Sequence, residues 1–202
     1  MTVTSITPLD KRRNKITFDE REPLVLYKGE IRRYHIEENE VLSEAVYDEI
    51  VDEILCKRAR ERVLYLLKAS DKTEQELRDK LKKGGYPAKP IDEAIALMKK
   101  YHYVDDRSYG ERYIDSCSKR KSRNCIKYDL IQKGLDRDSV RELLDEVQVD
   151  EEGQIRRFLE KKHYIPGETE PKEKNKLRMA LARKGFSYET ITRVMGMEEY
   201  FD

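Results

Sequence analysis

Cysteine is scarce in this sequence. Its 202 residues include three cysteines, at positions 56, 117 and 125, and no Cys-x-x-Cys pair. An odd number of widely spaced cysteines is not typical of a disulfide-stabilised secreted domain, so we expect reduced thiols in a cytoplasmic protein. No cysteine lies at metal-ligand spacing from any of the three histidines. The sequence therefore predicts no metal site.

Long apolar runs and net charge are also lacking. No apolar run approaches the roughly 20 residues that a membrane-spanning helix needs. The chain has 42 basic and 41 acidic residues, a net charge of +1, which argues against nucleic-acid binding through bulk charge alone. The charge is nevertheless uneven: residues 1–57 carry a net −4, residues 58–104 a net +5, residues 105–150 a net −1 and residues 151–202 a net +1. Local basic patches are therefore the charge feature to look for.

The common sequence motifs of catalysis are missing as well. The chain has no Walker loop, no dinucleotide-binding fingerprint and no nucleophile elbow. Its adjacent carboxylates, Asp105 and Asp106, stand where a helix is expected to begin, and we interpret them as helix caps. We therefore expect no catalytic residues, no cofactor and no enzyme activity.

One pattern, in contrast, occurs three times. Six positions are separated by the same offsets in each copy: +4, +4, +1, +5 and +4. The copies are Leu77, Leu81, Gly85, Tyr86, Ile91 and Ile95; Ile126, Leu130, Gly134, Leu135, Val140 and Leu144; and Leu177, Leu181, Gly185, Phe186, Ile191 and Met195. The glycines lie 49 and 51 residues apart, a period typical of stacked helical units.

Each copy reads as helix, loop, helix, glycine turn and helix. Thr73 and Glu76 form a capping-box sequence before the second helix of copy one. Pro87 stands two residues after the first glycine, and Asp136 and Ser187, which are good N-caps, stand two residues after the other glycines. His102-Tyr103-Val104 and His163-Tyr164-Ile165 resemble each other but fall at different phases of the repeat, so we interpret their likeness as coincidence.

The segment before the repeats lacks their apolar pattern and contains short runs of residues that favour β-strands. Residues 1–13 are polar without a period and are expected to be a disordered tail. Residues 14–57 are expected to form a β-hairpin and a helix, with strands at 24–27 and 30–36 around Lys28-Gly29 and a third strand at 16–18. The helix should begin near Ser43.

The predicted fold is therefore mainly α: an elongated tandem array of three three-helix repeats, preceded by a small N-terminal β-hairpin plus helix. The repeats are expected at residues 58–104, 105–150 and 151–202.

These residues resemble the RecX family, bacterial regulators of the RecA recombinase. Tyr103-Val104-Asp105-Asp106 followed by Tyr109 is similar to the family's aromatic, aliphatic and paired-acid motif. The segments 77–81, 126–135 and 177–186, together with 26–30, also fit, so that the resemblance covers roughly residues 15–195. A departure is His102, which stands where the family usually has glycine. The resemblance implies a cytoplasmic monomer that binds the RecA filament on DNA and inhibits or modulates its recombinase, ATPase and co-protease activities.

The basic residues are the candidates for contact with such a partner. The densest run is Lys119, Arg120, Lys121, Arg123 and Lys127, and it is either a contact with acidic protein or DNA phosphates or a solvated loop. Further cations precede each glycine of the pattern, where they either complement the helix dipole or face a periodic partner. These are Lys82, Lys83, Lys133, Arg183 and Lys184.

Two other functions remain open at this point. The repeats could bind nucleic acid directly, with a weak contact to single- or double-stranded DNA, or they could be a generic scaffold for another protein. Binding to bare single-stranded DNA, compared with binding to RecA–DNA filaments, separates direct nucleic-acid binding from filament regulation.

Overall fold

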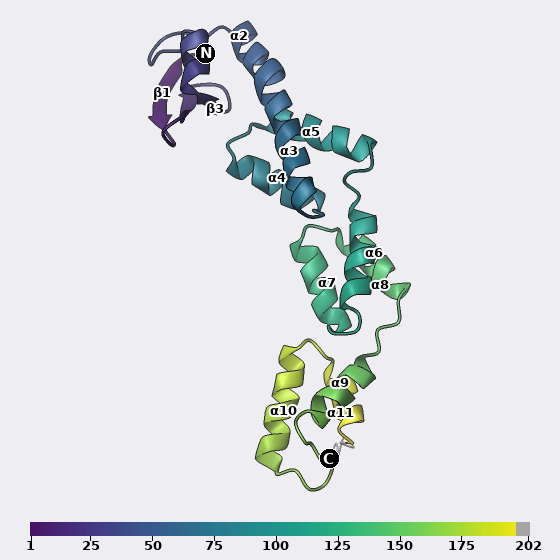
Figure 1. The fold of residues 1–202 in the computed structure, drawn as a ribbon. Coiled ribbons are helices and arrows are strands. Elements are labelled where there is room, and N and C mark those ends of the chain that lie inside the picture. The colour runs from purple at the N-terminus through teal and green to yellow at the C-terminus, as the bar shows by residue number, and fades with distance from the viewer. Residues whose placement is uncertain (197–202) are drawn as a thin grey trace. The chain divides into compact units, whose positions relative to one another are not determined.

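The computed structural model describes residues 1–196, and the chain divides into two compact units (Figure 1). The first unit is Met1–Asp105 and the second begins at Asp106. The predicted third repeat extends to residue 202, and its residues 197–202 lie outside the described part. Among the described residues, no helix is both long enough and apolar enough to cross a membrane.

The first unit opens with a three-stranded antiparallel sheet. β1 (Val3–Pro8), β2 (Arg13–Phe18) and β3 (Leu24–Tyr27) follow one another in the order of the chain. Ile16 of β2 stands opposite Ile6 on one side and Leu24 on the other. Successive side chains of a strand point to opposite faces, so Leu24 and Leu26 enter the N-terminal core and Val25 faces the other way.

The expectation of a disordered tail at residues 1–13 is wrong. Val3 is only 1% exposed, and β1 is paired along β2. The following turn is closed by the carboxylate of Asp10, which accepts the backbone N–H groups of Arg12 and Arg13 at 2.8 Å each. β1 has little apolar pattern of its own, and its threonines and its pairing with β2 favour a strand instead.

The prediction of a hairpin strand at residues 30–36 is also wrong. The hairpin pairs β2 with β3, and residues 28–33 form the short helix α1 (Lys28–Arg33). Glu30 explains the change, because its carboxylate accepts the Tyr27 N–H at 2.7 Å and so caps the helix. Arg32 and Arg33 in the last turn complement the helix dipole.

One continuous helical run connects the sheet to the first repeat. It comprises α2 (Glu44–Glu49), the π-helical segment η1 (Ile50–Cys56) and α3 (Lys57–Ala69). Ser43 is its N-cap, as predicted, and accepts the Val46 N–H at 3.3 Å. Residues up to Cys56 pack in the N-terminal core, and residues from Ala59 pack in the core of the first repeat. The predicted boundary after residue 57 therefore falls inside a helix, where one core gives way to the next.

The first repeat continues with α4 (Glu74–Lys83) and α5 (Ala88–Lys100). The predicted capping box of Thr73 and Glu76 is present, and Pro87 stands at the N-cap of α5. The turn between these helices packs on the sheet. A Cβ added to Gly85 would lie 2.3 Å from a methyl carbon of Val25, so only glycine allows β3 to approach so closely.

The second unit contains the other two repeats. They consist of α6 (Asp106–Cys117), α7 (Arg123–Gln132) and α8 (Arg137–Asp145), and of α9 (Glu151–Glu160), α10 (Pro171–Arg183) and α11 (Tyr188–Val194). Asp136 and Ser187 cap α8 and α11 as predicted. All the apolar pattern positions of the three copies are buried except Tyr86, which is half-buried.

Helix ends in this chain share one backbone motif. Gly85, Gly134 and Gly185 have φ of 81°, 93° and 82°, and the residue after each donates its N–H to the carbonyl five residues earlier. This is the Schellman turn. The three histidines do the same: His35, His102 and His163 have φ of 49°, 56° and 53° and are followed by equivalent bonds. The two similar His-Tyr segments fall at different phases of the repeat, as predicted, after α5 and after α9, and what they share is this helix-ending turn.

Two candidate basic sites

Each unit contains a concave site whose lining includes several cations. We call the site in the first unit the sheet groove and the site in the second unit the repeat pocket. The sheet groove has a volume of about 1270 Å³ and lies where β2, β3, α3 and the end of α4 meet. The repeat pocket has a volume of about 470 Å³ and lies between the second and third repeats.

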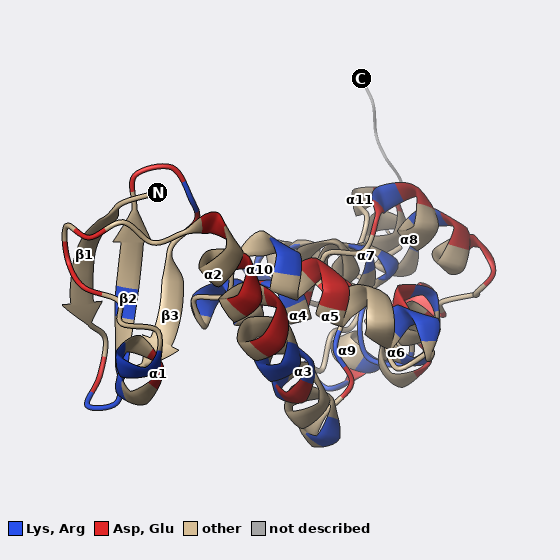
Figure 2. Ribbon diagram, turned by 90° about the horizontal axis from the view of Figure 1, so that it is seen from above, with Lys and Arg blue, Asp and Glu red and all other residues tan. Residues whose placement is uncertain are grey.

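Seven cations line the sheet groove. Figure 2 shows basic residues in the turn between β1 and β2 and along α3, two of the elements that border it. The seven are Arg13, Lys15, Arg58, Arg62, Lys80, Lys82 and Lys83. Lys82 and Lys83 were candidates from the sequence, and the other five were missed, since they come from segments far apart in the chain. Arg58 and Arg62 could have been noticed, because their i, i+4 spacing places them on one face of a helix.

Two tyrosines also line this groove. Tyr27 is 42% exposed, and the guanidinium carbon of Arg58 lies 4.6 Å from the centre of its ring. Arg58 is held there by an ion pair with Glu30 and a hydrogen bond to the Val25 carbonyl. Burial raises the pKa of Tyr86, and the positive charges of Arg58 and Arg62 oppose that shift. Aromatic and guanidinium groups thus converge in the groove.

The repeat pocket brings together part of the predicted basic run. Lys119, Arg120 and Lys121 line it together with Lys184 and with two cations that were not candidates from the sequence, Arg157 of α9 and Lys161 at the C-cap of that helix. Phe158 and Phe186 supply its apolar surface. The ammonium of Lys184 lies 5.7 Å from the centre of the Phe158 ring.

Two residues of the basic run, Lys121 and Arg123, bind to helices of the second repeat. The Lys121 ammonium donates to Asp129 at 2.7 Å and to the Tyr113 hydroxyl at 2.9 Å. The bond to Asp129, followed by that to Tyr113, raises the pKa of Lys121. Arg123 donates to the Leu144 carbonyl at 2.5 Å and pairs with Asp145 at the end of α8. These contacts give Lys121 and Arg123 a role in holding the second repeat together.

The remaining predicted residues are dispersed. Lys127 and Arg183 are exposed and lie outside the pocket lining. Lys133 is half-buried, with its ammonium 5.4 Å from the centre of the Tyr109 ring. The cations before the three glycines therefore lie in different surroundings and do not form one set of equivalent surface charges.

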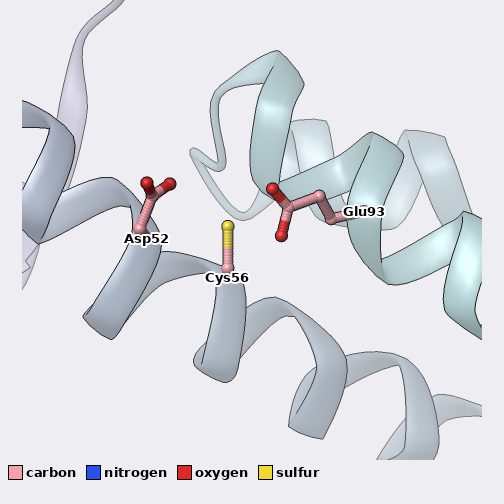
Figure 3. Close-up of side chains that lie close together, drawn as sticks. All are labelled: Asp52, Cys56 and Glu93. Atoms are coloured by element: carbon pink, nitrogen blue, oxygen red, sulfur yellow. The ribbon is translucent and has the colours of Figure 1, made fainter.

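A third cluster contains possible metal ligands (Figure 3). Asp52, Cys56 and Glu93 place their ligand atoms within 4.8 Å of one another. Burial, together with a hydrogen bond to Glu93, raises the pKa of the Cys56 thiol to about 12, whereas a metal ligand must be a thiolate. Asp52 is engaged by the Lys89 ammonium at 2.5 Å. The chemistry of the cluster fits a polar contact between η1 and α5 better than a metal centre.

Comparison with known proteins identifies the family. Models of the first, second and third three-helix domains of RecX match residues 59–96, 105–144 and 150–195. The regulatory protein RecX of Clostridium perfringens strain 13 is 31% identical over 185 residues, which cover 88% of this chain and 85% of that protein. The regulatory protein RecX of Clostridium tetani is 37% identical over 143 residues, covering 69% and 66%.

A solved structure agrees on the fold. A crystal structure of a regulatory protein RecX superposes with a TM-score of 0.61 at 18% identity, covering 98% of this chain and 99% of that one. The family consists of regulatory proteins and not of enzymes, in agreement with the sequence-based expectation. The chain belongs to the RecX family of regulatory proteins.

Proposed function

We propose that this chain regulates the RecA recombinase by binding the filament that RecA forms on DNA. The observation that carries the proposal is the match to all three RecX domains in order along the chain. The two basic sites support it, because such a filament combines DNA phosphates with a repeating protein surface. Several weak contacts on one chain add to a large avidity when neighbouring binding sites are in reach.

By binding the filament, the protein inhibits or retunes three activities of RecA: strand exchange, ATP hydrolysis and the co-protease activity. The repeat pocket is the proposed contact with recombinase, through Lys119 and Arg120 on its rim. Lys127, Lys133, Arg183 and Lys184 are secondary candidates for the same partner. The chain acts as a cytoplasmic monomer and needs no cofactor.

The direct test is RecA ATPase activity on single-stranded DNA, titrated with the protein. We expect the activity to fall as the protein is added, with saturation below one protein per RecA subunit if each chain contacts more than one subunit. Unchanged ATPase and strand exchange at stoichiometric protein would contradict the proposal. A second measurement compares binding to RecA–DNA filaments with binding to the bare strand at the same salt concentration, and the filament should bind more tightly.

The alternative function is direct nucleic-acid binding. The specific observation in its favour is the sheet groove, which combines cations with tyrosines. Tighter binding to bare DNA than to the filament would make this the main function.

A further inference from the structure

We propose that the sheet groove binds one strand of nucleic acid. The site would be formed jointly by the N-terminal sheet and the first repeat, and the RecX domain models begin only at residue 59. The inference deepens the proposed function and rests on it for its setting, since a recombinase filament on DNA presents such a strand. It assigns the DNA contact to the first unit and leaves the repeat pocket for protein.

The first argument is the balance of charge in the groove. Arg13 and Arg58 are paired with Asp10 and Glu30, which are not among the lining residues. Among the described residues, four exposed lining lysines have no ion-pair partner: Lys15 on β2, and Lys80, Lys82 and Lys83 on α4. Backbone phosphates are the complementary ligand for several unpaired ammonium groups along one groove.

The acids of the groove do not cancel this charge. The lining includes Glu22 and Glu61. The carboxylate of Glu22 accepts the Ala88 N–H at 3.0 Å and is thereby committed to the N-terminus of α5. Glu22 and Glu61 together offset two of the five positive charges of the four unpaired lysines and Arg62, so a net excess of three positive charges remains. Five of the seven lining cations lie in residues 58–104, the segment with a net charge of +5.

The second argument is the stacking surface. The Tyr27 ring and the Arg58 guanidinium form a platform whose geometry is fixed by Glu30 and the Val25 carbonyl. Unpaired bases stack on aromatic rings and guanidinium planes, whereas the bases of a duplex are already stacked and paired. An acidic peptide would satisfy the lysines but would leave the platform unused. Charge and platform together favour a single strand over a duplex or a peptide.

The third argument is that the groove is preformed. The Gly84-Gly85 turn is packed against Val25, which holds the end of α4 beside the sheet. Lys82 and Lys83 are thereby placed in the same groove as Lys15 of β2. The backbone positions of these cations are therefore fixed before binding, and no rearrangement of the chain is needed to bring them together.

The experiment uses the full chain without recombinase, so it is independent of the proposed function. A fluorescein-labelled oligothymidylate is titrated with the protein at several salt concentrations, and binding is followed by anisotropy. The first variant combines Lys15→Gln, Lys82→Gln and Lys83→Gln. Its matched control combines Lys172→Gln, Lys174→Gln and Lys176→Gln on α10, which removes the same charge from a helix outside both sites.

We expect the groove variant to bind more weakly and its logarithmic salt slope to decrease by about 2, because each phosphate contact on a single strand contributes about 0.7. The control should keep the slope and affinity of the wild type. Tyr27→Leu should weaken binding about tenfold with an unchanged slope, since stacking is largely independent of salt. Tyr128→Leu, an exposed tyrosine on α7, should have no effect. Melting curves by circular dichroism establish that all four variants are folded.

Three results would overturn the inference. The groove variant could bind like the wild type, or the α10 control could lose as much affinity as the groove variant. A duplex of equal length or polyglutamate of equal charge could compete as well as the unlabelled single strand. RecA inhibition is measured separately with the same proteins, so that a protein that inhibits RecA but fails these tests contradicts only the groove assignment.

Discussion

The two units use the same glycine turn against chemically different surfaces. In the first unit, Gly85 lies against the methyl groups of Val25 on the sheet. In the second unit, a Cβ on Gly185 would lie 2.6 Å from the Ser122 hydroxyl and 2.9 Å from the Cys125 sulfur. In the first and third repeats, the turn that ends the second helix is thus also the surface by which the repeat packs on the element before it.

The contact of the Gly185 turn, which we call the polar version, includes hydrogen bonds to the carbonyls of the turn. The contact of the Gly85 turn with Val25, the apolar version, is made by methyl groups. Ser122 caps α7 by accepting the Cys125 N–H and also donates to the Lys184 carbonyl at 2.8 Å. Asn124 donates to the Gly185 carbonyl at 3.0 Å, and Gln154 of α9 donates to the Ser118 carbonyl at 2.9 Å. A left-handed turn therefore accepts either an apolar or a polar neighbour, provided that no side chain occupies the glycine position.

The largest effect is expected from Gly85→Ala. The positive φ costs about 1–2 kcal/mol in an alanine, and the clash with Val25 adds about 1–3 kcal/mol of overpacking. Gly167→Ala is the control, because Gly167 has φ of 83° and nothing within 4 Å of an added Cβ. Urea unfolding, with hydrogen exchange followed in the unit that carries each substitution, should show the larger loss for Gly85→Ala. Equal losses for the two variants would mean that the turn does not pack tightly on the sheet.

The next effect concerns the polar version of the contact. Ser122→Ala and Ser187→Ala each remove an N-cap bond worth about 1 kcal/mol. Ser122→Ala also removes the bond to the Lys184 carbonyl, a further loss of about 0.5–1.5 kcal/mol. Hydrogen exchange of the second unit should therefore show a greater loss of stability for Ser122→Ala. Identical values would show that the two repeats gain no stability from this bond.

The sequence pattern predicted the repeats well because their physics is local. Leucine spacing, caps such as Thr73 and Asp136, and glycines at helix ends all act within a few residues. The N-terminal errors have the opposite cause. β1 is a strand because β2 lies beside it, and residues 28–33 are helical partly because Glu30 caps the helix and pairs with Arg58 on α3. The cap by Glu30 is local, but β2 as the partner of β1 and Arg58 as the partner of Glu30 lie outside a short sequence window.

Prediction of the candidate sites from the sequence is limited for the same reason. The run from Lys119 to Lys127 was visible in the sequence, but nothing local showed that Lys121 would meet Asp129 while Lys119 stayed exposed. The sheet groove was even less visible, since β2, α3 and α4 each contribute a few cations from segments of different net charge. Sequence indicates which cations exist, and only the fold determines which of them share a surface.

A smaller effect on stability, which depends on pH, is expected from Asp129 in the second unit. Burial raises the pKa of its carboxyl, but hydrogen bonds from Lys121 and Tyr113 outweigh this, and the pKa is lowered in the folded chain. The stability from this group is complete above the unfolded pKa of about 4 and is lost as the pH falls through the lower folded value. Asp129→Asn should therefore flatten the acid limb of the melting temperature against pH. Asp138→Asn, on the exposed surface of α8, is the control and should leave that limb as it is in the wild type.

The smallest effect on stability is expected from reversal of Lys119 and Arg120. Both are exposed. The Arg120 guanidinium donates to the Ser116 carbonyl, and the Lys119 side chain makes no hydrogen bond or ion pair among the described residues. Lys119→Glu with Arg120→Glu should therefore change the free energy of unfolding by less than about 0.5 kcal/mol. The same pair should raise the concentration needed for half-inhibition of RecA ATPase several-fold, since reversed rim charges oppose an acidic partner.

Two matched variants complete this test of whether the repeat pocket contacts recombinase while the sheet groove contacts DNA. Arg137→Glu with Arg141→Glu reverses two exposed charges on α8 outside the pocket lining and should leave inhibition intact. Lys121→Glu should lower the melting temperature instead, because it places a second carboxylate beside Asp129. If the Lys119 and Arg120 variant is folded and inhibits fully, the repeat pocket is not the contact with recombinase. The basic sheet groove would then be the candidate that accounts for filament binding, and the two units would have to exchange the roles proposed for them.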